Sequence, residues 1–183
     1  MMPIGPLMVE HRLIERVVKL MGERGRMIDE APVNVGFVDS AVEFMRTYAD
    51  RCHHGKEEGI LFRGVRRKSL KPEHAKAIDE LIKEHVYGRG LVGQLAEARS
   101  RYVGEDEKAA GDVRRCLLLI AEFYPKHIEK EDKRFFMQAM DYFSGEEQDI
   151  MLMEMREFDR SLIHERYGRL VEELEGMNRY KKR

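Results

Sequence analysis

The stretch from His53 to Glu58, with the sequence HHGKEE, places histidines and glutamates four residues apart. Residues with this spacing project from the same side of a helix. His53 with Glu57, or His54 with Glu58, could therefore present an imidazole and a carboxylate to one cation. This mixture of nitrogen and oxygen ligands suits iron, manganese or zinc better than calcium or magnesium. One such pair fits an exposed helix face equally well in a chain with 37% charged residues.

The same spacing recurs 74 residues further along the chain. The pairs related by this offset are His11 with His85, His53 with His127, and Glu57 with Glu131. Both His11 and His85 also directly follow a glutamate. A chance scatter of charges would rarely place four histidines and two glutamates under one translation. We interpret the pattern as an internal repeat.

The repeat predicts two helical hairpins. The midpoint between His11 and His53 falls at Pro32, which interrupts a helix. The midpoint between His85 and His127 falls in a polar run that follows a glycine. In an antiparallel hairpin, both histidines of a pair would lie at one level, roughly 30 Å from the turn at about 1.5 Å per residue. Two hairpins related by a pseudo-twofold axis would form a four-helix bundle with the repeated residues in its core.

Apolar residues at spacings of three and four predict the helices that position these side chains. The helices are expected at about residues 7–29, 35–62, 73–103 and 109–140, with a fifth at about 146–178, outside both repeats. The predicted fold is therefore all-α. An antiparallel four-helix bundle occupies residues 1–142, and residues 143–183 form a C-terminal helix that packs on the bundle or on a second subunit of a homodimer.

Composition limits the class of protein further. A chain of 183 residues with 43% hydrophobic residues can bury one proper core. The net charge of −1 provides no electrostatic reason to expect nucleic acid or an anionic membrane as a partner. No apolar run approaches the ~18 residues of a membrane span, and the N-terminus has no signal-peptide pattern. We expect a soluble, cytoplasmic protein, and its two cysteines do not make a disulfide framework.

The ordered set of motifs resembles the hemerythrin-like, HHE cation-binding family. The motifs are GPLMVEHR at residues 5–12, CHHGKEEGILF at 52–62, Glu84-His85 with Gly88-Arg89, and His127 with Glu131. They extend over about residues 5 to 136. The resemblance implies a four-helix bundle that holds a non-haem di-iron centre with two bridging carboxylates.

Carried over to this chain, the resemblance implies a set of six metal ligands. They would be His11, His53, Glu57, His85, His127 and Glu131. Manganese or zinc are alternatives to the two iron ions. We prefer His53–Glu57 to the neighbouring pair His54–Glu58, because only the former obeys the 74-residue offset. Glu15 stands at the same offset from Arg89, and we expect these two to pair beside the metal.

One departure from the family pattern affects the expected function. Oxygen-carrying members have an additional histidine, in a His-x-x-x-His pair on the third helix, whereas Leu81 and Arg89 stand four residues before and after His85. This chain is therefore more similar to members tied to nitric oxide, peroxide or iron handling.

Three interpretations remain. The first is a di-iron protein that binds or reacts with a small ligand such as O2, NO or peroxide. The second is an iron or redox sensor, or an iron storage module, that signals through a partner. The third is a structural bundle with incidental histidines, which the repeat argues against. Whether the protein is an enzyme stays open.

Overall fold

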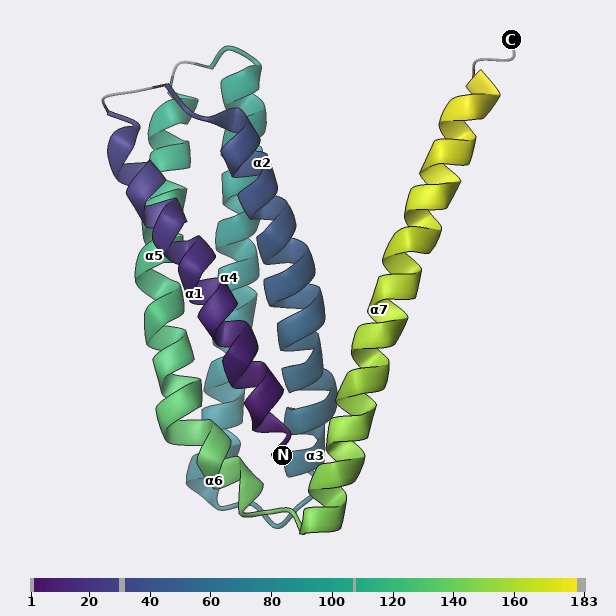
Figure 1. The fold of residues 1–183 in the computed structure, drawn as a ribbon. Coiled ribbons are helices and arrows are strands. Elements are labelled where there is room, and N and C mark those ends of the chain that lie inside the picture. The colour runs from purple at the N-terminus through teal and green to yellow at the C-terminus, as the bar shows by residue number, and fades with distance from the viewer. Residues whose placement is uncertain (1, 30–31, 107, 181–183) are drawn as a thin grey trace.

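The computed structural model describes residues 2–29, 32–106 and 108–180, with side chains up to residue 162 within these ranges. The described residues form helices and no strands. Four long helical segments run side by side as an antiparallel bundle, and a fifth helix stands against one end of it (Figure 1). The predicted all-α class and architecture are confirmed. None of the helices in these ranges is long and apolar enough to cross a membrane.

The helices follow the order that the sequence predicted. The first hairpin consists of α1 (Ile4–Met27) and a composite second rod of α2 (Val35–Phe44), η1 (Met45–His54), η2 (Glu57–Phe62) and α3 (Arg63–Val65). The second consists of α4 (Pro72–Val103) and a composite rod of α5 (Ala109–Lys130), η3 (Glu131–Phe135) and α6 (Phe136–Met140). The last helix is α7 (Gly145–Tyr180). Helix α1 begins three residues earlier than expected, because a proline such as Pro6 is tolerated in a first helical turn.

The segments η1, η2 and η3 are π-helical, which the sequence did not reveal. A π-helix bonds each N–H to the carbonyl five residues back and is frequently found at functional sites. Its wider turn rotates less per residue than an α-helical turn. Adjacent residues such as His53 and His54 can therefore both face the bundle interior, and both are buried.

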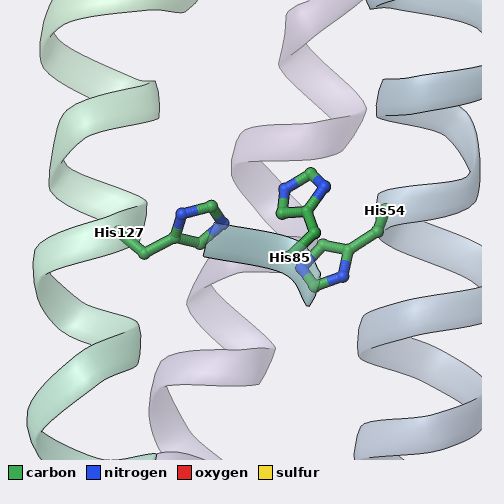
Figure 2. A group of neighbouring side chains, drawn as sticks. All are labelled: His54, His85 and His127. Carbon is green, nitrogen blue, oxygen red and sulfur yellow. The ribbon is translucent and has the colours of Figure 1, made fainter. Parts of the chain in front are cut away.

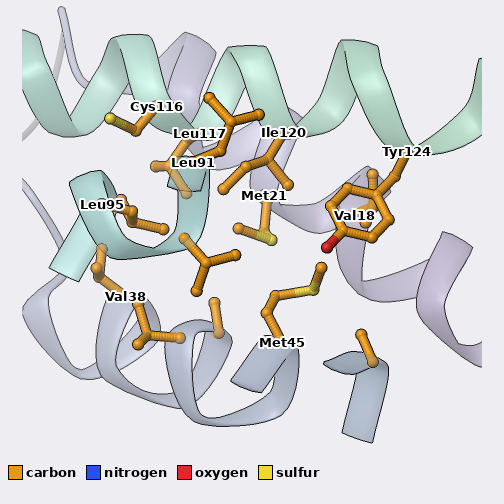
Figure 3. Packing of buried hydrophobic residues seen from close by; sticks show 14 of the residues in the cluster. Val18, Met21, Val38, Met45, Leu91, Leu95, Cys116, Leu117, Ile120 and Tyr124 are labelled. Atoms are coloured by element: carbon orange, nitrogen blue, oxygen red, sulfur yellow. The ribbon is translucent and has the colours of Figure 1, made fainter. Parts of the chain in front are cut away.

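Two apolar clusters fill the bundle, one on each side of a polar layer. The cluster nearer the hairpin turns includes Met21, Leu95, Leu117 and Ile120 (Figure 3). The cluster at the other end includes Leu7, Leu61, Leu81 and Phe136. The repeated histidines and glutamates lie in the sequence between members of the two clusters, so apolar packing encloses them from both ends.

Helix α7 joins the bundle through its first turns. Met151 and Met155 are buried in the cluster opposite the hairpin turns. The ring of Phe158 approaches Gly55 so closely that a Cβ atom at position 55 would lie 2.8 Å from its Cζ atom. Beyond this contact, α7 diverges from the bundle (Figure 1). The side chains of 163–180 and the residues 181–183 lie outside the described part, so the packing predicted for the outer half of this helix remains a prediction.

Helices α1 and α5 approach each other closely at Gly22, and a substitution there tests the described packing. A Cβ atom at Gly22 would lie 2.9 Å from the Cβ of Ala121, whereas a Cβ at Gly90 would meet nothing within 4 Å. Alanine raises helix propensity at both positions. We expect Gly22→Ala to have a free energy of unfolding about 1–3 kcal/mol lower than Gly90→Ala, the cost of overpacking. Urea unfolding of both variants measures the difference, and equal values would contradict the packing described.

Candidate metal centre

The bundle brings all six predicted ligands into one buried layer. Each is at most 2% exposed: His11, His53, Glu57, His85, His127 and Glu131. These six residues and His54 offer possible ligand atoms that fall into two adjacent groups, each with all atoms within 4.8 Å of one another. The first group contains His11, His53, Glu57 and Glu131, and the second contains His54, His85 and His127 (Figure 2).

The two glutamates lie between the histidine groups. Glu57 places Oε1 3.2 Å from Nε2 of His53 and Oε2 3.4 Å from Nε2 of His85. Glu131 places Oε2 3.2 Å from Nε2 of His11 and 3.3 Å from Nε2 of His127. Each carboxylate thus reaches a histidine of both groups, which is the arrangement that a bridging carboxylate requires.

The outer nitrogens of the repeated histidines all face carboxylates. The Nδ1 distances are 2.7 Å from His11 to Asp132, 2.9 Å from His53 to Glu10, 2.7 Å from His85 to Glu58 and 2.8 Å from His127 to Glu84. Histidines that bind metals commonly donate their second ring N–H to a carboxylate, which fixes the ring and leaves the other nitrogen free to coordinate. Here that free nitrogen is Nε2, which points into the layer in all four residues.

These supporting acids obey the 74-residue offset as well. Glu10 and Glu84 are one such pair, and Glu58 and Asp132 are another. The lysines that pair with Glu10 and Glu84, Lys56 and Lys130, are also 74 residues apart. The sequence shows the two glutamates before His11 and His85, but we did not predict their role from it. The repeat carried enough information to find that role.

Several buried polar atoms in this layer lie near one another without forming a hydrogen bond to any described residue. They are both carboxylate oxygens of Glu57, Oε2 of Glu131 and Nε2 of His127. An unsatisfied buried polar group costs about 1–3 kcal/mol, and more when it is charged. In addition, the Nε2 atoms of His11 and His53 face each other at 2.8 Å. Cations between the two groups would satisfy all of these atoms, so the residues fit a metal centre.

His54 belongs to the site, although we did not predict it as a ligand from the sequence. It is 2% exposed, and its ring stacks on that of His85 with centroids 3.9 Å apart. The offset from His54 leads to Ile128, so the repeat excluded this residue. His54 thus places a third histidine beside His85 and His127, and it comes from the second rod rather than from the third helix. Regular α-helical periodicity cannot show this, because the inward turn of His54 depends on the π-helical segment η1.

Arg89 supports the site through other partners than expected. The predicted pairing with Glu15 is wrong: Glu15 pairs with Arg12 at 3.1 Å. Arg89 instead donates from Nε to Asp50 at 2.7 Å and from Nη2 to Glu58 at 2.8 Å. These carboxylates contact the outer nitrogens of His54 and His85 respectively. Arg89 therefore holds the supports of two histidines together.

Burial and nearby carboxylates shift the pKa of four histidines in the layer. Burial alone lowers the pKa of His11, but Asp132 and Glu131 outweigh it and raise the pKa to about 10. In the same way, carboxylates overcome burial to raise the pKa of His85 to about 9 and that of His53 to about 8. Burial dominates at His54 and lowers its pKa to about 4. Without metal, protons supply the positive charge that the carboxylates require.

Comparison with known proteins gives one match. The family model described as Hemerythrin HHE cation binding domain matches residues 2–139. This range contains every residue of the site and the bundle up to the penultimate residue of α6. Neither a curated protein nor a solved structure matches the chain.

The histidine pKa values predict how the metal-free protein responds to pH. The pKa is about 6.5 in the unfolded chain and about 8, 10 and 9 in the folded protein for His53, His11 and His85. A histidine whose pKa is raised on folding contributes fully to the free energy of unfolding below pH ~6.5. This contribution is lost as the pH rises through the pKa of the histidine in the folded protein. We expect the Tm of the metal-free protein to fall from pH 7 to pH 10 more than that of the metal-loaded protein. Equal decreases in Tm for the two forms, measured by circular dichroism, would contradict the assignment of these histidines as metal ligands.

Proposed function

Because the chain belongs to the hemerythrin HHE cation-binding family, we propose that it holds two iron ions in this layer and uses them to bind or react with a small ligand such as O2, NO or peroxide. The observation that supports this proposal is the buried set of three carboxylate oxygens and one imidazole nitrogen that lack hydrogen-bond partners among the described residues. Manganese or zinc are alternative occupants with compatible ligand preferences.

Each ion would have its own histidines and share the two glutamates. His11 and His53 would hold one ion, and His54, His85 and His127 would hold the other, with Glu57 and Glu131 shared. This set leaves coordination positions for a small ligand, and bound iron supplies redox and Lewis-acid chemistry. The carboxylates behind each histidine keep the rings oriented, and the apolar clusters above and below exclude bulk water.

Metal content tests this assignment. We expect close to two iron ions per chain after anaerobic loading. His53→Ala should lower the iron content more than His54→Ala. The first substitution would leave its ion with one of two histidines, whereas the second would leave its ion with two of three. His74→Ala serves as the control, because His74 contacts Tyr142 away from the site. Iron content near zero in the parent protein would defeat the proposal, and the reverse ranking would defeat the division of ligands.

A second candidate function is an iron or redox sensor, or a storage module, in which α7 transmits the state of the site to a partner. Lys56 is 0% exposed and pairs with Glu10 and, at 2.7 Å, with Asp159 of α7. Glu10 in turn contacts His53. In the other half, Lys130 pairs with Glu84 and is 30% exposed. The link from the site to α7 therefore exists in one half of the repeat.

Hydrogen exchange of the α7 backbone tests this link. Iron binding should increase protection near Asp159, since ordering His53 and Glu10 orders Lys56 as well. Asp159→Asn should remove much of this increase. The matched control is Glu154→Gln, because Glu154 lies on the same helix and pairs with Arg63 without contacting Lys56. Protection of α7 that does not depend on iron in the parent protein would rule out the sensor mechanism.

A further inference from the structure

A cavity of about 200 Å³ lies beside the buried layer of histidines and glutamates, which is called the metal layer below. Its walls come from η1, α4 and α5, and it is lined by Met45, Arg46, Asp50, Arg89, Val92, Gly93 and Tyr124. Met45, Val92 and Tyr124 are buried, whereas Arg46 and Gly93 are exposed. The cavity thus has an apolar inner part and an opening at the surface. Its volume exceeds what a ligand of two or three heavy atoms needs.

Tyr124 gives this cavity a polar group without a partner. The residue is 2% exposed, and its hydroxyl makes no hydrogen bond within the described part of the chain. The hydroxyl turns toward Met45, which lines the same cavity (Figure 3). The hydroxyl lies at the cavity wall, where it can donate a hydrogen bond to a small molecule that enters the cavity.

The cavity adjoins the part of the metal layer that departs from the repeat. The ring of Tyr124 lies parallel to that of His54, with centroids 6.4 Å apart, and edge-on to that of His127 at the same separation. Asp50 of the cavity wall contacts Nδ1 of His54 at 3.3 Å, the longest of the five histidine–carboxylate distances at the site. Of the five histidines, His54 is therefore the one held least tightly, and it borders the cavity.

Charge at the opening favours the entry of an anion. Arg46 and Arg89 both line the cavity, and Asp50 is its single acidic lining residue. Arg89 is shared between Asp50 and Glu58. Arg46 forms no ion pair with any residue in the described ranges and is free to attract a ligand.

We propose that this cavity is the entry chamber through which a small hydrogen-bond acceptor of two or three heavy atoms reaches the metal layer on the side of His54, and that the Tyr124 hydroxyl is the donor that retains it. This inference rests on the proposed function, because the ligand's destination is the metal centre. It adds the route of the ligand to the metal centre, its approach on the side of His54, and Tyr124 as a residue that determines specificity.

Azide binding to the oxidised two-iron protein tests the route. Gly93 and Gly90 are both exposed glycines of α4 at which a Cβ atom would meet nothing within 4 Å, but of the two only Gly93 lines the cavity. Gly93→Phe should slow azide association about tenfold, with iron content unchanged. Gly90→Phe, which gains the same helix propensity, should associate like the parent protein. Equal association rates for the two variants would overturn the route.

A second variant tests whether the Tyr124 hydroxyl retains the ligand. Tyr124→Phe keeps the ring and removes only the hydroxyl, so the fold and the iron content should be preserved. We expect azide to dissociate about fivefold to tenfold faster, the effect of one lost hydrogen bond, with a shifted absorption spectrum of the complex. Unchanged dissociation would overturn the role of Tyr124. Failure of the iron-loaded parent to bind azide at all would instead overturn the proposed function, and the entry chamber with it.

Discussion

The enclosure of polar, ionisable side chains between two apolar clusters is the constraint on which this structure depends. Burial of an unpaired carboxylate is very unfavourable, and Glu57 and Glu131 are both 0% exposed. Their pKa values are nevertheless lowered, because surrounding histidines outweigh the effect of burial. The fold therefore requires positive charge in this layer. Protons can supply it in the metal-free state, and cations match the orientation of the lone pairs better.

The side chains that support the histidines of the layer follow the internal repeat. Each of the four repeated histidines is backed by a carboxylate from a neighbouring helix, and two of these carboxylates are backed by lysines. Such contacts fix ring orientation before any ligand binds. They also join the four rods of the bundle across the layer, where apolar packing is interrupted. The supporting shell thus contributes both to the site and to the cohesion of the fold.

Sequence reasoning could predict the features that local patterns encode. The apolar periodicity located the start of α4 to within one residue, and the 74-residue offset identified six of the residues that the bundle brings together. The π-helical segments could not be predicted, because they interrupt the 3.6-residue period on which helix prediction relies. His54 was missed for the same reason. The partners of Arg89 depend on long-range packing, and the repeat indicated Glu15 incorrectly.

The differences between the two halves carry more functional information than their similarity. A symmetric repeat explains how a bundle could acquire two equivalent groups of ligands. Within the described residues, the departures from the pseudo-twofold relation include the added His54, the cavity beside Tyr124, and the contact of Asp159 in α7 with Lys56. The first two would distinguish the ion proposed near His85 from its counterpart, and the third lies behind His53. If both proposals hold, one end of the layer serves ligand access and the other contacts α7, so ligand binding at one ion and a response of α7 at the other would be coupled through the shared glutamates.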